Sequence, residues 1–299
     1  MQISVVIVTY NSENHIFFFF FFVFKNNDIG RDLEVLIVDN CSRNFNVTKQ
    51  TLIDNYGDTI RIIENTKNGG YGQGNNVGVK YASAPIIMIM NPDVRLVKPV
   101  FKSVIQAFDD KRVALYSFQQ RNAEGKRGFS IACSSTVYPL LAIPINNICN
   151  KVGLYFSKFM YVAGACFFIR KTSLEDIGMF DENIFMYKEE DDIHYRLSKL
   201  PNVLLKYNPN ISYLHLHGLY SNPKHYTDCK EEILRLKNSI YLNTKRGFTK
   251  REIIKREIIY NRLRLINALI SGLISKSESK KNHIMHLKAW LNELNLTLK

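Results

Sequence analysis

Residues 4–11 read SVVIVTYN, a short run of apolar, β-branched residues that ends in two hydroxyl groups and an amide. A run of this length and composition predicts a buried strand over Ser4–Val8. Three similar runs follow at Leu33–Val38 (LEVLIV), Arg61–Glu64 (RIIE) and Pro85–Met90 (PIIMIM). Segments of helical length and composition separate them, at 13–26, 44–56 and 75–82. Strands that alternate with helices predict an α/β fold with a doubly wound, mostly parallel sheet flanked by helices.

The rest of the chain divides into a less regular middle and a helical end. Residues 110–160 mix short apolar pieces with Gly, Pro and Asn, and we expect loops over the sheet there. Further elements are predicted as strands at Tyr161–Arg170 and Ile211–His217, and as a helix at 190–200. From Asp228 the pattern is helical to the end, with breaks near Gly247 and at 272–282. We therefore expect an α/β domain over 1–225 and a basic, helical C-terminal region over 226–299.

Composition excludes a disordered chain and indicates the kind of partner. Apolar residues make up 46% of the 299 residues, which excludes disorder as the main state. Lys and Arg number 40 against 27 Asp and Glu, so the net charge of +13 favours anionic partners such as nucleic acid, acidic lipid or phosphorylated substrates.

Cysteines and apolar runs bear on the compartment. The five scattered cysteines form no C-x-x-C pair, which argues against a disulfide framework or structural zinc and favours a reducing compartment. The longest uncharged apolar run, Ile16–Phe24, has nine residues, whereas a spanning helix needs about 20. Within it, the phenylalanine run Phe17–Phe22 reads as a buried helix face, with a membrane-dipping patch as the alternative. The start of the chain lacks the basic region of a signal peptide.

Polar residues follow each of the first four predicted strands. In open parallel sheets ligands bind beyond the carboxyl ends of the strands, because the connecting loops converge there. Each group alone suits a turn or a helix cap, but four together favour a polar ligand. The groups are Thr9-Tyr10-Asn11, Asp39-Asn40, the glycine-asparagine stretch 68–76 and Asn91-Pro92-Asp93.

The turn sequences narrow the class of ligand. The turn after the first strand is TYNS rather than G-x-G-x-x-G, and the chain has no G-x-x-x-x-G-K-[ST] loop, so dinucleotide and P-loop binding are weak hypotheses. A nucleotide whose base lies near Asp39 fits better, since a carboxylate can accept from the N3–H of uracil or thymine. The glycines at 69–74 would let the backbone approach a ribose or diphosphate closely.

Acidic residues and histidines suggest a metal ion and a general base. A diphosphate is commonly bridged by a divalent cation held by one or two carboxylates, and Asp93 stands in a suitable position after a buried strand. The alternative for Asp93 is an Asx turn. The cluster Glu189–Asp192 could contain a general base, or could simply start a helix. His215 and His217 share one face of a predicted strand, where either could bind metal or phosphate, or be structural.

Several motifs together resemble glycosyltransferase family 2 with the GT-A fold, and in particular the rhamnosyltransferase-like enzymes of bacterial surface polysaccharides. The resemblance covers about residues 3–222. Its motifs are VVIVTYN (5–11), VDNCS (38–42), NGGYGQGNNVG (68–78), MNPDV (90–94), GACFFIRK (164–171) and IGMFDENIFMYKEEDDIHYRL (177–197).

This resemblance implies an inverting transfer of a sugar such as rhamnose or galactose, from a dTDP- or UDP-linked donor to a saccharide or polyprenyl-linked acceptor. It implies Mg²⁺ or Mn²⁺ on Asp93, while His215 and His217 are further metal candidates from the strand pattern alone. The family's base falls on Glu190 where an Asp is usual, so Glu189 and Asp192 stay open as alternatives. The expected donor-binding residues are Thr9, Tyr10, Asn11, Asp39, Asn68, Gly70, Gly72, Asn75, Asn76, Asn91, Gly164 and Ala165.

The basic segment 230–264 holds eleven Lys or Arg against four Glu, a net charge of +7. It reads either as helices packed on the catalytic domain or as a surface that meets anionic lipid. The second reading, together with a lipid-linked acceptor, places the protein in the cytoplasm at the inner face of the cell membrane. A nucleic-acid-binding protein would interleave exposed aromatics with the basic residues, and this tail is mostly aliphatic, so we expect no nucleic acid. The remaining rival is a catalytically silent partner subunit that binds a nucleotide sugar.

Overall fold

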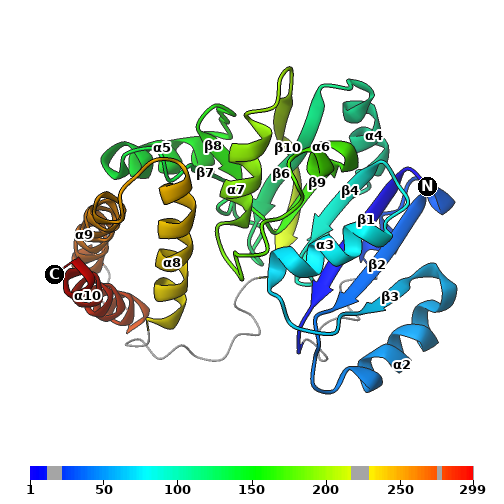
Figure 1. The fold of residues 1–299 in the computed structure, drawn as a ribbon, viewed down its shortest axis with the longest axis horizontal. Helices are drawn as coiled ribbons and strands as arrows, with labels where there is room; N and C mark the ends of the chain where they lie inside the picture. The colour runs from blue at the N-terminus through cyan, green and yellow to red at the C-terminus, as the bar shows by residue number, and fades with distance from the viewer. Residues whose placement is uncertain (12–21, 217–228, 275–277, 299) are drawn as a thin grey trace. The chain divides into compact units, whose positions relative to one another are not determined.

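The computed structural model describes residues 1–11, 22–216, 229–274 and 278–298 (Figure 1). Most of the predicted helix 13–26 therefore lies outside the described residues, as do Phe17–Phe21 and His217; residues 22–25 are helical. Contacts divide the chain into two compact units. The first comprises residues 1–132 and 149–217, and the second comprises 133–148 and 218–299.

The first unit is built on an eight-stranded mixed sheet whose order is β3-β2-β1-β4-β9-β6-β10-β5. The pairings of β1 with β2 and β4, of β2 with β3, and of β6 with β10 are parallel, whereas β9 and β5 run antiparallel to their neighbours. The mostly parallel α/β architecture predicted from the sequence is thus confirmed. The strands are β1 (Ile3–Thr9), β2 (Leu33–Asp39), β3 (Arg61–Glu64), β4 (Ile86–Met90), β5 (Val94–Leu96), β6 (Val113–Arg121), β9 (Cys166–Arg170) and β10 (Leu204–His215).

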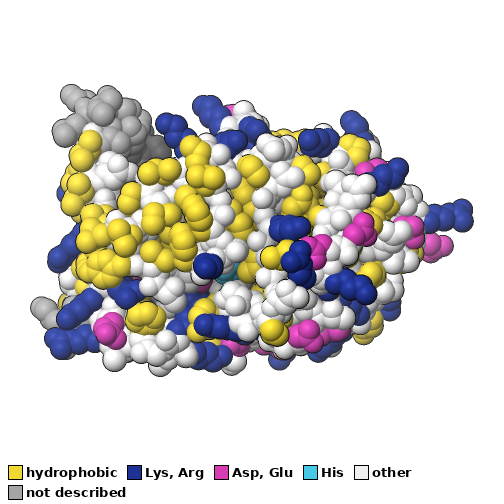
Figure 2. All heavy atoms as spheres, turned by 90° about the horizontal axis from the view of Figure 1, so that it is seen from above, with side chains coloured by type: hydrophobic (Ala, Val, Ile, Leu, Met, Phe, Trp, Pro, Cys, Tyr) yellow, Lys and Arg dark blue, Asp and Glu magenta, His cyan; other side chains and the backbone are white. Residues whose placement is uncertain are grey.

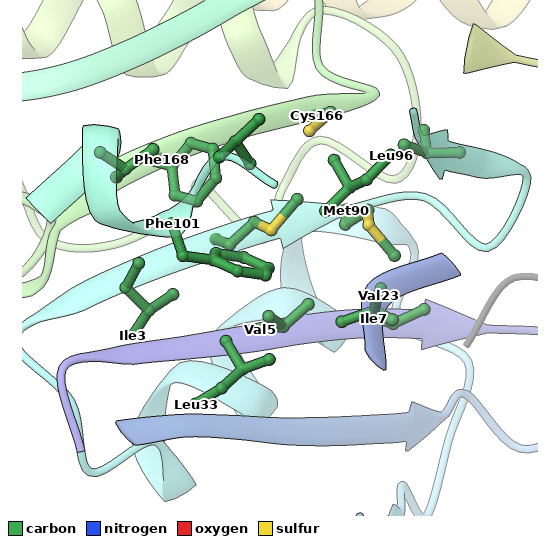
Figure 3. Close-up of a cluster of buried hydrophobic side chains, with 14 of the residues drawn as sticks. Ile3, Val5, Ile7, Val23, Leu33, Met90, Leu96, Phe101, Cys166 and Phe168 are labelled. Atoms are coloured by element: carbon green, nitrogen blue, oxygen red, sulfur yellow. The ribbon is translucent and has the colours of Figure 1, made fainter. Parts of the chain in front are cut away.

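Helices cover both faces of this sheet, which explains why its central strands are continuous apolar runs. All seven residues of β1 are buried. One face packs with Leu52 of α2 (Phe45–Tyr56) and Phe101 of α4 (Phe101–Asp109) in the main core. Figure 3 shows Ile3, Val5 and Ile7 of β1 in this cluster, with Phe101, Met90 and Phe168.

The opposite face of β1 and β2 carries α3 (Tyr71–Tyr81) at close range (Figure 1). A Cβ on Gly78 would lie 2.3 Å from Cγ1 of Val6, and one on Gly74 would lie 2.7 Å from Cγ1 of Val8. The glycines therefore let helix and strand backbones approach each other. The sequence predicts a helix over 75–82, but the helix begins at Tyr71, four residues earlier and inside the glycine-rich stretch.

Two predictions for the middle of the chain are wrong. Residues 110–160 are not mainly loops: β6 is a central strand, and the segment also contains β7 (Ile131–Cys133) and α5 (Pro139–Val152). Residues 161–170 form two strands rather than one, because β8 (Met160–Val162) pairs with β7 while β9 joins the main sheet. The break between them falls at 163–165, around Gly164. The first unit also contains α6 (Lys171–Asp176) and α7 (Glu189–Leu197).

The second unit contains α8 (Lys230–Lys245), α9 (Lys250–Ile274) and α10 (Glu278–Leu298), in agreement with the predicted helical end and its break near Gly247. Their shared core includes Leu236, Ile254, Trp290 and Leu294. Its helices also hold the segment after β7, since Arg256 donates to the carbonyl of Thr136 at 3.0 Å. Among the described helices, none is both long enough and apolar enough to cross a membrane.

Candidate active site

The topology of the first unit brings the predicted site residues to one edge of the sheet. The parallel strands β1, β2 and β4 end there at Thr9, Asp39 and Met90. The antiparallel strands β9 and β5 begin at the same edge, because Cys166 pairs with Met90 and Val94 pairs with His215. Loops from five strands therefore meet at this edge.

Asp39 lies buried at the end of β2, with Ser42 as its partner. The Ser42 backbone N–H donates to Oδ2 at 2.9 Å and its hydroxyl to Oδ1 at 2.5 Å. Since each carboxylate oxygen can accept two hydrogen bonds, these contacts leave acceptor capacity for a ligand N–H. The Thr9 hydroxyl is buried and donates to the Val38 carbonyl at 3.4 Å, whereas Tyr10 is exposed.

The ends of β1 and β2 are tied together in unusual backbone conformations. Asn11 and Cys41 have φ values of 47° and 66°, in the left-handed region that non-glycine residues rarely adopt. The Asn11 N–H donates to the Ser42 hydroxyl at 2.8 Å, and the Arg43 N–H donates to Oδ1 of Asn11 at 3.1 Å. Such outliers persist only where the surroundings hold them, and they gather at functional sites.

An amide network joins β2 to the start of α3. The side chain of Asn40 donates to Asn68 at 2.9 Å and to the Gly70 carbonyl at 3.0 Å. Gly70 has a φ of 91°, and a Cβ there would lie 2.0 Å from the Phe185 carbonyl oxygen, so only glycine fits. In this structure Asn68 and Gly70 shape the loop that faces the site.

Three predicted donor-binding residues of α3 also have structural partners. Gly72 lies against Phe180, since an added Cβ would be 3.1 Å from the Cβ of that residue. The side chain of Asn76 is buried and bonded to both the N–H and the carbonyl of Phe180, at 2.9 and 3.0 Å. The Asn75 side chain donates to the Tyr71 carbonyl at 2.9 Å, but its Oδ1 is buried with no hydrogen-bond partner in the described part of the chain.

The Asn91-Pro92-Asp93 turn follows β4 and lies beside β10. Oδ1 of Asp93 is 3.2 Å from Nε2 of His215, and the Asp93 carbonyl accepts from the Leu216 N–H at 3.0 Å. The N–H of Asn91 donates to the Ala165 carbonyl at 2.8 Å. Oδ1 of Asn91 is buried and has no hydrogen-bond partner among the described residues.

A carboxylate and an imidazole at this distance suit a divalent cation such as Mn²⁺. In the described residues no group of three or more His, Cys, Asp or Glu side chains converges on one point. The described part of the protein could therefore offer at most this pair to a metal ion, and further coordination would have to come from the phosphates of a bound ligand or from water.

The acidic cluster forms the first turn of α7, and its four members differ in environment. Asp192 forms an ion pair with Arg196, which also donates to the Met179 carbonyl at 2.6 Å. Glu189 and Asp191 are buried. Glu190 is partly exposed and lies against Gly164, where an added Cβ would be 3.6 Å from its Oε2. Glu190 is thus the carboxylate of the cluster that is best placed to reach a ligand.

Backbone strain lies directly before this cluster. Tyr187 and Lys188 have φ values of 74° and 81°, so two consecutive non-glycine residues are left-handed. Lys188 is the N-cap residue of α7 and directly precedes the four carboxylates of the first helical turn. The helix dipole favours negative charge at this end.

Two tyrosines that the sequence analysis did not single out link these groups. The Tyr71 hydroxyl donates to the Gly164 carbonyl at 3.0 Å. Burial raises the pKa of Tyr71 well above its ordinary value, and the negative charges of Glu189 and Glu190 raise it further. Burial likewise raises the pKa of Tyr213, with smaller effects from neighbours that include Tyr71 and Asp93. The Gly164 turn thus contacts Tyr71 and Glu190, and the next residue, Ala165, accepts from the N–H of Asn91 in the turn that holds Asp93.

This mixed sheet with a polar, acidic edge is the GT-A glycosyltransferase fold. The chain superposes on the mannosyltransferase PcManGT from Pyrobaculum calidifontis with a TM-score of 0.63 and 12% identity. The alignment covers 99% of this chain and 86% of PcManGT. The chain also superposes on residues 1–349 of Staphylococcus aureus TarS with a TM-score of 0.55 and 16% identity, over 98% of this chain and 92% of that structure. These likenesses show the fold.

Residues 4–178 match the profile of the family described as glycosyl transferase family 2, so the chain belongs to that family. It is 25% identical over 216 residues to the low-salt glycan biosynthesis hexosyltransferase Agl10 of Haloferax volcanii, covering 65% of this chain and 61% of that protein. It is 27% identical over 161 residues to the rhamnosyltransferase WbbL of Escherichia coli, covering 49% of this chain and 60% of that protein. The chain thus spans about three fifths of the length of each of these two relatives.

Proposed function

We propose that the protein transfers a hexose-type sugar from a nucleoside diphosphate sugar to a saccharide or polyprenyl-linked acceptor in surface polysaccharide synthesis, with inversion at the anomeric carbon. The observation that carries this proposal is the meeting of Asp39, the Asp93–His215 pair and Glu190 at one sheet edge. Each group has the chemistry that one part of such a donor and acceptor requires.

The donor would lie along the ends of β1, β2 and β4. Asp39 would accept from the N3–H of a uracil or thymine base, and Thr9, Tyr10 and Asn11 would form the wall beside it. Oδ1 of Asn91, buried with no partner in the described chain, would accept from a ribose hydroxyl, because a buried acceptor without a partner costs free energy until it is filled. PcManGT has been solved with GDP-Man and Mn²⁺, and TarS with UDP-GlcNAc, which supports a nucleotide sugar as the donor here.

Asp93 and His215 would hold Mg²⁺ or Mn²⁺ against the diphosphate. The ion, when bound, would stabilise the negative charge that develops on the leaving diphosphate. His215 would favour Mn²⁺ over Mg²⁺, because imidazole suits the softer ion. His217 lies outside the described residues and stays a candidate from the sequence alone.

Glu190 would act as the general base. Its carboxylate would take the proton of an acceptor hydroxyl as that oxygen attacks the anomeric carbon from the face opposite the diphosphate. The bond between the anomeric carbon and the diphosphate oxygen breaks, and its electron pair leaves with the diphosphate. Asp192 is the weaker alternative, because its ion pair with Arg196 occupies the side chain. Glu189 is buried more deeply than Glu190.

A panel of nucleotide sugars tests both binding and turnover. A ligand that binds the native state raises the unfolding temperature, so one donor should shift it with Mn²⁺ present and others should not. The selected donor should then be hydrolysed slowly without acceptor and consumed faster with a saccharide acceptor. A catalytically silent partner subunit would give the thermal shift without any hydrolysis. If no nucleotide sugar shifts the unfolding temperature, the proposed function is wrong.

A further inference from the structure

The second unit exposes an apolar surface on α5 and α9. On α5, Leu141 and Ile148 are each 60% exposed, and Leu140 is also exposed. On α9, Ile266, Leu269 and Ile270 are exposed, and their spacing of three and four residues places them on one helix face. Figure 2 shows hydrophobic side chains gathered in a broad patch where α5 and α9 lie, with Lys and Arg at its margins.

Most of the net positive charge of the chain lies in the C-terminal segment that contains α8, α9 and α10. Residues 218–299 contain 17 Lys or Arg and seven Asp or Glu, a net charge of +10 out of +13 for the whole chain. In contrast, the 23 residues 128–150, which include most of α5, carry no charged residue at all. The second unit therefore combines an uncharged stretch of α5 with a strongly basic set of helices.

Helix α9 shows the same combination along one face. Arg251, Lys255 and Arg262 are exposed at helical spacing, and Ile266 and Ile270 continue that line by four residues each. The other face of α9 packs in the unit's own core through Ile254 and Ile258. The exposed apolar residues are thus not required for packing among α8, α9 and α10.

We propose that this surface, Leu140, Leu141 and Ile148 of α5 with Ile266, Leu269 and Ile270 of α9, docks on an anionic lipid bilayer. This proposal rests on the proposed function in one respect: the bilayer would hold the polyprenyl-linked acceptor. Apolar side chains would enter the headgroup region, and the basic residues of α9 would meet the acidic headgroups. A second copy of the chain fits less well, because apposing two such surfaces would bring together two units that each carry a charge of +10.

Vesicle flotation of the full chain tests the proposal. The protein should float with vesicles of phosphatidylglycerol and phosphatidylcholine, and much less with phosphatidylcholine alone. The double variant Ile266→Asp/Ile270→Asp should bind about tenfold more weakly or worse, since two buried side chains are lost from the lipid contact. Arg262→Gln should weaken binding about fivefold, the usual contribution of one basic residue near an anionic surface.

The matched control is Val47→Asp in α2, an exposed valine of the first unit, which should bind vesicles like the parent protein. Circular dichroism and the thermal shift with donor sugar should be unchanged in every variant, which separates this proposal from the proposed function. The proposal is overturned if the parent protein does not float with anionic vesicles, or if the double Asp variant floats as well as the parent. It is also overturned if sedimentation shows a dimer that the double variant abolishes while vesicle binding persists.

Discussion

Nε2 of His215, at the end of β10, lies 3.2 Å from Oδ1 of Asp93, in the turn between β4 and β5. The two residues are 122 positions apart in the sequence, and the antiparallel pairing of β5 with β10 brings them together, since His215 is in register with Val94. A pair built by sheet register is held by the core, so its geometry is set before any ligand binds.

Replacing Asp93 by Ala should reduce kcat/KM by about 100-fold or more, because charge stabilisation of the leaving diphosphate is lost. His215→Ala should be milder and should shift the metal preference away from Mn²⁺. Titration of activity with Mn²⁺ and Mg²⁺ measures both effects. The control is Asp109→Ala, an exposed aspartate at the end of α4. Unchanged metal dependence in Asp93→Ala would refute the metal role.

Replacing Glu190 by Gln should lower kcat by about 10² to 10⁴-fold and leave donor binding intact, because only proton transfer from the acceptor is lost. Glu190→Asp should recover part of the rate. Single-turnover rates measure the loss of the chemical step, and the thermal shift caused by the donor measures donor binding. Glu175→Gln, at an exposed position of α6, is the matched control. A normal rate in Glu190→Gln would move the base to Glu189 or Asp192.

We expect Tyr71 to position the turn at Gly164, against which Glu190 lies. Tyr71→Phe removes the hydrogen bond to the Gly164 carbonyl, which should cost about 1 kcal/mol of stability and reduce kcat more than it changes KM for the donor. Since the pKa of Tyr71 is held well above its ordinary value of 10.0, the hydroxyl stays protonated, and the defect should be constant from about pH 6 to about pH 9. Tyr81→Phe, at the end of the same helix, should behave like the parent. A defect that disappears within this pH range would contradict the positioning role.

Gly78→Ala should destabilise the first unit by about 1 to 3 kcal/mol, the usual cost of overpacking a core. The added methyl group would lie 2.3 Å from Cγ1 of Val6, on a strand that cannot move because both of its faces are buried. Denaturant unfolding measures the change. Lys80→Ala, exposed on the same helix, should leave stability nearly unchanged. Equal midpoints for the two variants would show that α3 is free to shift.

The first four strands were predictable because each is a short apolar run between polar turns. Strand β6 was missed because its polar residues have partners that are distant in the sequence. Ser117 donates to the Cys166 carbonyl at 3.0 Å, and Gln119 to the Ser130 hydroxyl at 2.5 Å. Nothing in the local pattern of 113–121 shows that these side chains are satisfied inside a sheet.

The candidate site was predictable to a similar extent. Asp39, Asp93 and the 189–192 carboxylates stand out because they follow strands or cluster. The pairing of Asp192 with Arg196 could have been found from its spacing of four residues, which places both on one helix face. Tyr71 and Tyr213 gave no such signal, since a tyrosine among glycines or in a strand is common and only the fold brings these two near the acids.

The complete burial of β1 limits how this scaffold can change in sequence. All seven side chains of β1 are buried, and α3 packs directly against this strand through Gly74 and Gly78. Under the proposed function, we expect that a change of sugar or acceptor preference would not come from substitutions in this strand. It must come from the loops that leave its tip, where Tyr10 already projects into solvent.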